Sequence, residues 1–197
     1  MDSTRTSLLR DVQDPRNSQR WMEFKAVYEP MITAFVRKQQ VPWHEVDELV
    51  QQVFIKLWEG IASYRRGEAR FHVWLYQVVR HAVYDWHRRQ NKDLRLREAA
   101  REQGRSAPVV LPEEPDAEWE HDFRRRVFEC ALASVRPEIE PATWACFEQH
   151  VVLARPAAEV ARELGRNVNA VYTSASRVLG KVRLACRRLT EEWRDGS

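Results

Sequence analysis

The feature that most constrains the fold is a run of apolar side chains at helical spacing between residues 46 and 61. These side chains recur at every third or fourth position: Val46, Leu49, Val50, Val53, Phe54, Leu57, Trp58 and Ile61. A stripe with this period buries one face of an α-helix. The opposite face is mainly acidic and amide in character and consists of Asp47, Glu48, Gln51, Gln52, Ile55 and Glu59. The segment therefore predicts an amphipathic helix whose polar face meets either solvent or a partner.

Apolar spacing of the same kind predicts further helices over residues 18–40, 71–89, 118–135 and 141–153. We expect Ser18 to cap the first of them and Pro30 to kink or divide it. No segment alternates in the manner of a strand, and the chain of 197 residues contains only 6 glycines. These patterns predict an all-α fold.

A proline-rich stretch separates the predicted helices into two groups. Residues 106–118 contain three prolines, which bars a continuous helix there. We therefore expect two small helical domains, residues 1–95 and residues 118–197, joined by a flexible linker over residues 96–117.

Charge is segregated along the chain, although the formal net charge is only +3. Residues 62–105 hold eleven Lys and Arg against five Asp and Glu, and residues 154–189 hold eight against two. Residues 106–122 hold six acidic residues and no Lys or Arg. This pattern favours two DNA-facing surfaces with an acidic connector, and the alternative is that each block is an ordinary solvated helix face.

Residues 156–182 have the pattern of a helix-turn-helix. Pro156 to Gly165 predicts a short helix with a glycine stop, and Asn167 is placed to cap the helix that follows. Val168, Val171, Ala175, Val178, Leu179 and Val182 are expected to face inward on that second helix. Its other face would be free for the major groove, together with Arg166 of the turn. This face carries Asn169, Tyr172, Thr173, Ser176, Arg177 and Lys181. Two helices joined at a glycine also occur by chance in helical proteins.

The sequence favours a binding protein without a metal or cofactor. Cys130, Cys146 and Cys186 are widely spaced among apolar helical positions, and they are expected to be buried reduced thiols. No signal-peptide core and no apolar run of about 20 residues is visible, so we expect a cytoplasmic protein without membrane insertion.

Four motifs, in order, resemble the extracytoplasmic-function group of the sigma-70 family over nearly the whole chain. They are the segment from Glu48 to Trp58, the segment from Tyr64 to Phe71 followed by Trp74 and Leu75, the run from Arg80 to Arg89, and the helix-turn-helix. The family pattern usually has Asp at Glu48, Glu at Gln52 and Asn at His81, and it often has more Arg near Tyr172. The resemblance implies a non-enzymatic initiation factor with no catalytic residue.

The resemblance also implies partners and sites. The partners are the core of RNA polymerase, through its clamp coiled coil and flap, promoter DNA, and an anti-sigma factor. Polymerase binding is expected at Asp47, Glu48, Gln51, Gln52 and Ile55. Reading and melting of the −10 element is expected at Tyr64, Arg65, Arg66, Arg70, Phe71, Arg80, Arg88 and Arg89. Reading of the −35 element is expected at Arg166, Asn169, Tyr172, Thr173, Ser176, Arg177 and Lys181.

Two interpretations remain open from the residues themselves. Tyr64 and Phe71 are suited either to stacking on an unpaired base among arginines or to simple core packing, and Trp74 is expected in the core. The alternative function is a helix-turn-helix repressor or activator with a sensing domain. That protein would be a stable dimer with a ligand pocket within residues 18–89.

Overall fold

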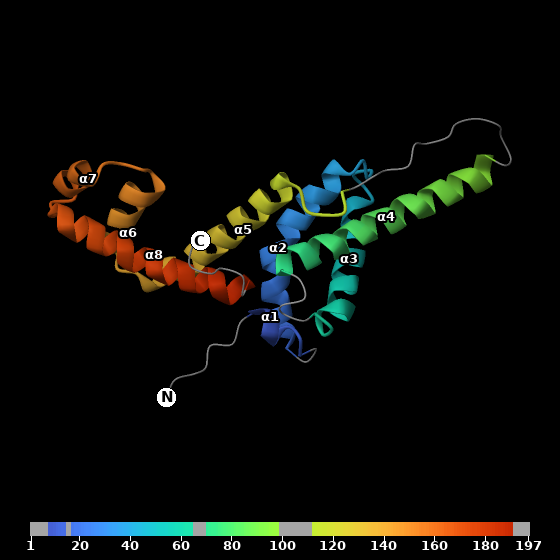
Figure 1. Ribbon diagram of the computed structural model, residues 1–197, viewed down its shortest axis with the longest axis horizontal. Coiled ribbons are helices and arrows are strands. Elements are labelled where there is room, and N and C mark those ends of the chain that lie inside the picture. The colour runs from blue at the N-terminus through green and yellow to red at the C-terminus, as the bar shows by residue number, and fades with distance from the viewer. Residues whose placement is uncertain (1–7, 15–16, 65–69, 99–111, 191–197) are drawn as a thin grey trace. The chain divides into compact units, whose positions relative to one another are not determined.

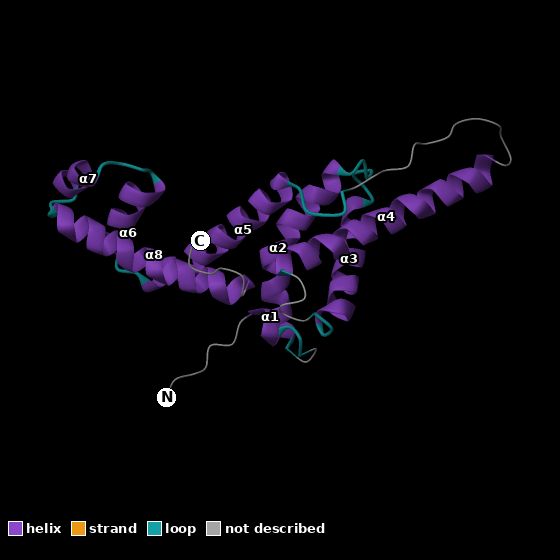
Figure 2. Cartoon of the chain, in the orientation of Figure 1, coloured by secondary structure: helices purple, strands orange, loops and turns teal. Residues whose placement is uncertain are grey.

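In the computed structural model, the described residues are 8–14, 17–64, 70–98 and 112–190, and side chains are described for these residues except 93–98. Every regular element in these ranges is a helix, as Figure 2 shows, so the predicted all-α fold is confirmed. The elements, labelled in part in Figure 1, are α1 Leu8–Asp11, α2 Ser18–Lys38, α3 Val46–Ile61, α4 Phe71–Glu98, α5 Ala117–Val135, η1 Arg136–Glu138, α6 Pro141–Phe147, η2 Glu148–Val152, α7 Ala157–Glu163 and α8 Val168–Thr190.

The helices form two compact units. The first unit comprises Arg10–Arg124, and the second contains residues 125–190. The boundary between them lies within α5, so Ala117–Arg124 at the start of this helix packs with the first unit. The division by role into residues 1–95, 96–117 and 118–197 stays a prediction, and residues 99–111 of the expected linker lie outside the described residues.

The core of the first unit lies between α2, α3 and α4, and α3 packs against both of the others. The apolar stripe predicted for residues 46–61 faces this core, and all of its members are buried except one. The exception is Trp58, which keeps 38% of its surface exposed and packs edge-on against Trp21 of α2, with 5.0 Å between ring centroids. The stripe therefore fixes how α3 is rotated and turns its polar face outward.

Two details of α2 differ from expectation. Asn17, rather than Ser18, caps the helix, because its side-chain oxygen accepts from the backbone N–H of Arg20 at 3.3 Å. Pro30 does not divide the helix, which runs continuously from Ser18 to Lys38. Pro30 lies on the exposed side, where its ring meets solvent rather than packed neighbours.

An aromatic cluster surrounds the start of α4. Phe71 has no exposed surface, and its ring lies 5.7 Å from those of both Tyr64 and Trp74. Gly60 of α3 makes room for this cluster, because a Cβ at that position would come within 3.3 Å of Trp74. The helix continues to Glu98, past Gln90, where the apolar periodicity fades.

In the second unit, α6 and α7 both pack on α8. Their core is Cys146, Ala157, Val160, Ala161 and Val171, with Leu164 partly buried against it. The helix predicted over residues 141–153 is interrupted: α6 ends at Phe147, and a wider π-helical turn, η2, follows. Apolar spacing does not distinguish these two kinds of turn, which explains the error. No described helix combines the length and the apolar character needed to cross a membrane.

Candidate functional site

The exposed face of α3 presents the residues that the resemblance assigns to polymerase binding. Asp47, Glu48 and Gln51 are exposed, and Gln52 is half-buried. Ile55 lies on the same face with 58% of its surface exposed. The face therefore offers carboxylate and amide groups around one accessible apolar side chain, which suits a protein partner with basic and apolar groups.

This face is tied to α4 by a chain of side-chain hydrogen bonds. Arg89 on α4 donates from Nη2 to Oε1 of Gln52 at 2.6 Å, and Gln52 donates from Nε2 to Oε1 of Glu48 at 3.2 Å. The structure thus joins Arg89, which was expected to bind the −10 element, to Gln52 and Glu48, which were expected to bind polymerase. Arg89 is held against the α3 face in this arrangement.

An ion-pair cluster lies further along the seam between α3 and α4. Lys56 Nζ contacts Oδ2 of Asp85 at 2.8 Å, and Arg88 Nη2 lies 3.4 Å from Oδ1 of the same carboxylate. The hydrogen bond from Lys56 lowers the pKa of Asp85, and the charges of Lys56, Arg88 and Arg89 act in the same direction. The pairing of Asp85 with Arg88 follows from their spacing on one helix, whereas the contact with Lys56 joins two helices and has no local sequence signal.

A cavity of about 160 Å³ opens between α3 and α4. Glu45 forms part of its wall, and Oε2 of Glu45 accepts from Nε1 of Trp86 at 2.8 Å and from Nε2 of Gln90 at 3.0 Å. Glu48, Gln52 and Arg89 also line it. Its walls are mainly charged and amide groups, and they coincide with the face described above.

The two rings expected to capture a base, in the segment from Tyr64 to Phe71, are both buried in this structure. Tyr64 and Phe71 are 8% and 0% exposed, so the core-packing interpretation describes both side chains here. Gln13 holds the start of this segment by donating from Nε2 to the backbone oxygens of Ile61 at 3.2 Å and Tyr64 at 3.0 Å.

The arginines around this segment are found in different settings. Arg65 and Arg66 lie outside the described residues. Arg70 is exposed, and its carbonyl accepts from the backbone N–H of Trp74 at 3.0 Å at the start of α4. Arg80 is half-buried with its guanidinium 4.8 Å from the ring centroid of Tyr84, a cation–π distance. Arg80 is thus a packed residue, whereas Arg70 and Arg88 are accessible.

The second unit contains a helix-turn-helix built as the sequence predicted. Gly165 follows α7 with a φ of 62°, a conformation that suits glycine, and it ends that helix. Oδ1 of Asn167 accepts from the backbone N–H of Ala170 at 2.7 Å and caps α8. Val160 and Ala161 of α7 and Val171 of α8 are buried where the two helices pack.

The exposed face of α8 carries the residues expected at the −35 element. Arg166 of the turn is exposed with Asn169, Tyr172, Thr173, Ser176, Arg177 and Lys181. Tyr172 is 54% exposed, and its ring packs edge-on against His150 at 5.2 Å. Val168 was expected inward, but it is 37% exposed at the first position of α8.

Comparison with known families assigns the first unit. Residues 26–93 match the family Sigma-70 region 2, which includes all of α3 and most of α2 and α4. This match covers 68 of the 197 residues. The matched residues contain the polar α3 face, the seam with α4 and the buried rings of Tyr64 and Phe71.

Solved structures give weaker likenesses. The chain is similar to CnrH, in a structure with the cytosolic domain of CnrY, at 17% identity and a TM-score of 0.35, covering 90% of this chain and 93% of that one. It is also similar to the sigma factor RpoE from Bartonella quintana, in a complex with the anti-sigma factor NepR, at 15% identity and a TM-score of 0.35 over 84% and 95% of the two chains. The search of curated proteins returned no match.

Proposed function

We propose that this protein is a sigma factor of the extracytoplasmic-function group, which binds core RNA polymerase and directs initiation at specific promoters. One observation carries the proposal: a sigma-70 region 2 and an exposed helix-turn-helix occur in the same chain. Such a protein acts by differential binding and uses no catalytic residue. An anti-sigma factor is a further expected partner, by the resemblance alone.

Core binding is assigned to the α3 face. Asp47, Glu48 and Gln51 are exposed and can meet a basic coiled coil, and Ile55 adds an apolar contact on the same face. Charged groups on such a surface chiefly set partner choice and association rate, while the apolar residue contributes area removed from water.

Duplex reading at the −35 element is assigned to α8. The early residues Asn169 and Thr173 are suited to base edges, because the N-terminal part of a recognition helix enters the major groove. Arg177 and Lys181 lie one and two turns further along and are suited to phosphates, which set register and affinity rather than sequence preference.

Melting of the −10 element is assigned to the segment from Tyr64 to Phe71. Stacking on an aromatic ring contributes about 1–3 kcal/mol per base, which is comparable to the few kcal/mol that it costs to extrude one. Because both rings are buried here, base capture requires this segment to rearrange.

A charge-reversal experiment tests the assignment of core binding. Replacing Glu48 and Gln51 together by Arg should weaken binding of the full-length protein to purified core polymerase by tenfold or more, about 1.4 kcal/mol. The matched variant is Arg177→Ala, which should bind core normally and lose affinity for promoter duplex. Titration of labelled core measures the first effect, and a mobility shift with duplex DNA measures the second.

The result for the unaltered protein decides the proposal as a whole. Binding to core, followed by transcription from a promoter selected out of random DNA, would support it. A stable dimer that does not bind core would overturn it in favour of a repressor or activator.

A further inference from the structure

Residues 112–124, here called the acidic clasp, cover a face formed by α2 and α4. Trp119 is the centre of this contact and is only 2% exposed. Its ring lies edge-on to Phe35 of α2 at 5.1 Å and to Tyr76 of α4 at 5.3 Å. Its Nε1 donates to the backbone oxygen of His72 at 3.2 Å, so the polar atom of the indole is satisfied as well.

Phe123, one turn further along α5, reaches the aromatic cluster at the start of α4. It is 4% exposed, and its ring is stacked on Tyr28 at 6.0 Å. It also lies 6.3 Å from Phe71 and 5.5 Å from His72. The clasp therefore supplies one wall of the site that buries Phe71.

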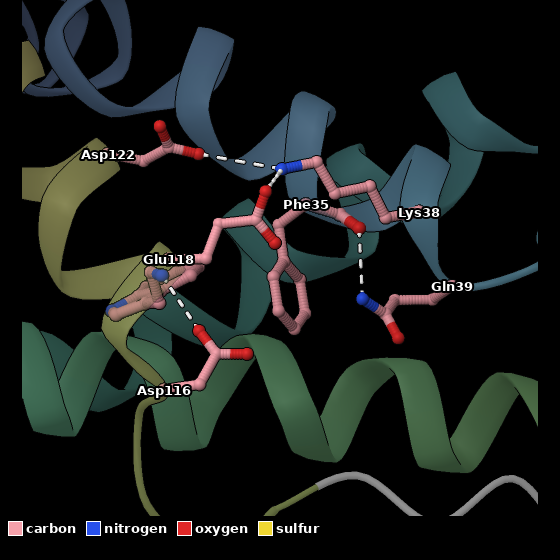
Figure 3. A network of polar contacts seen from close by, with 7 residues as sticks. Phe35, Lys38, Gln39, Asp116, Glu118 and Asp122 are labelled. Atoms are coloured by element: carbon pink, nitrogen blue, oxygen red, sulfur yellow. Dashed lines mark hydrogen bonds and ion pairs between the residues drawn. The ribbon is translucent and has the colours of Figure 1, made fainter.

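Charged groups surround this apolar centre, as Figure 3 shows. Lys38 at the end of α2 places its Nζ 2.6 Å from Oε1 of Glu118 and 3.7 Å from Oδ2 of Asp122. Oδ1 of Asp116 accepts from the backbone N–H of Trp119 at 2.8 Å, which caps the first turn of α5. The acidic residues expected to form a connector thus have a specific basic partner.

The residues just before α5 are attached to α4 by their backbone. Tyr76 donates from its hydroxyl to the carbonyl of Pro112 at 2.9 Å, and Gln77 donates from Nε2 to the carbonyl of Glu113. Burial raises the pKa of Tyr76, so the hydroxyl remains protonated and able to donate. The clasp is therefore held along its whole length, by backbone at one end and by rings at the other.

The ion pairs at the edge of the clasp are open to salt and to competition. The side chains of Lys38 and Glu118 are 46% and 66% exposed. Exposed pairs of this kind contribute about 0–1 kcal/mol and weaken as salt is added. The rings beneath them supply most of the attraction, so loss of the ion pairs would loosen the clasp without exposing a buried charge.

The second half of the clasp is the beginning of α5, a helix that continues into the second unit. Ala117–Arg124 belongs to the first unit, while the rest of the same helix belongs to the second. Release of the clasp would therefore free the first two turns of α5 from the first unit while the helix itself stays intact.

We propose that the acidic clasp is a releasable cover of the α2–α4 face, and that it keeps Phe71 in the core until the protein engages DNA. The occupant of this face is residues 112–124 of the chain itself. The regulatory part of this inference rests on the proposed sigma function, because release would uncover one side of a ring assigned to base capture. The structural part, that the clasp opens while the rest of the first unit stays folded, does not depend on that function.

Hydrogen exchange of the full-length protein tests the structural part. Lys38→Glu places three carboxylates together, and we expect amides of residues 117–124 to exchange roughly three- to tenfold faster while α3 is unchanged. Combining it with Glu118→Lys and Asp122→Lys should restore slow exchange. Lys25→Glu is the matched control, because Lys25 pairs with Glu29 on the same helix and has similar exposure, 42%. If Lys38→Glu changed the exchange rates of the clasp and of α3 by the same factor, or changed neither, the proposal would be overturned.

Promoter opening with core polymerase tests the regulatory part. We expect Lys38→Glu to form open complexes faster than the unaltered protein, with normal rates for Lys25→Glu and for the triple variant. An unchanged opening rate despite a loosened clasp would overturn the regulatory role and leave the sigma assignment intact. Absence of initiation by the unaltered protein would instead overturn the proposed function, and the regulatory role with it, while the exchange result would still decide whether the clasp opens.

Discussion

At the scale of single residues, the fold shields the three cysteines to different degrees. Cys146 and Cys186 are buried, at 0% and 1% exposure, whereas Cys130 on α5 is only half-buried, which corrects the expectation that all three are buried. Burial raises the pKa of the Cys186 thiol to about 11 and also raises the pKa of Cys130. Because the thiolate is the nucleophile, both the raised pKa and the lack of access should slow the reactions of Cys186.

We therefore expect alkylation of the native protein at about pH 8 to modify Cys130 well before Cys186. The folded protein holds the Cys186 proton more tightly than the unfolded chain, whose thiol has its ordinary pKa of 9.0. Stability should consequently fall as the pH rises from 9 toward 11. Mass spectrometry of iodoacetamide-treated protein over time measures the order of labelling. Equal alkylation rates for Cys130 and Cys186 in the native protein would contradict the prediction. Denatured protein is the control, because both thiols should react there.

At the scale of elements, the turn of the helix-turn-helix depends on two local features. Gly165 adopts a φ of 62°, and a Cβ there would meet no atom within 4 Å. Asn167 supplies the cap of the following helix. The cost of placing another residue at Gly165 would therefore be backbone strain alone, without steric conflict.

Gly165→Ala should lower the free energy of unfolding by about 1–2 kcal/mol, the cost of a left-handed conformation for a residue with a Cβ. Gly180 provides an internal comparison, because it lies within α8 and a Cβ there also has no atom within 4 Å. Gly180→Ala should raise the free energy of unfolding by up to about 1 kcal/mol through helix propensity. Chemical denaturation of both variants measures the two changes, and a change of the same sign in both would contradict the assignment.

The predictability of each element follows from how local its causes are. The rotation of α3 and the turn between Gly165 and Asn167 were predictable, because periodicity, a glycine stop and a cap are encoded within a few residues. The width of the turn after Phe147 was not, since the same apolar spacing fits both geometries.

Contacts between distant residues were the main part of the site that the sequence did not reveal. Glu118 and Asp122 stood out as members of an acidic stretch, but Glu118 is 80 residues from Lys38 in the sequence, and a contact over that separation leaves no periodic signal. Similarly, Tyr64 and Phe71 are aromatic, and an aromatic ring is equally suited to stacking on a base and to packing in a core. Only their neighbours in three dimensions distinguish these settings.

At the scale of the whole molecule, the basic and acidic blocks have different local partners. In the acidic stretch, Glu118 and Asp122 contact Lys38. In the basic block over residues 154–189, Arg155 is paired with Glu163 at 2.7 Å, while Lys181 lies 3.6 Å from Glu138 and keeps 44% exposure. Lys181 is thus the better placed of these two cations to contact a phosphate.

If Lys181 contacts a phosphate, its loss should change the salt dependence of DNA affinity. Each such contact contributes about −0.9 to the slope of log affinity against log salt for duplex DNA. Lys181→Ala should reduce the magnitude of that slope by about this amount and weaken binding similarly across sequences. Lys181→Arg retains the charge and should keep the slope. Fluorescence titrations of DNA binding at several salt concentrations measure this slope. An unchanged slope for Lys181→Ala would show that Lys181 does not contact a phosphate.

The residues that cover the α2–α4 face also determine where the protein can be divided into soluble fragments. A fragment ending at residue 95 would lack Trp119 and Phe123, and it would present the rings of Phe35 and Tyr76 to water. Contiguous apolar surface of this kind promotes aggregation. A fragment ending at residue 124 would keep its own cover, so the natural cutting point for isolating the first unit lies inside a helix rather than in the proline-rich stretch before it.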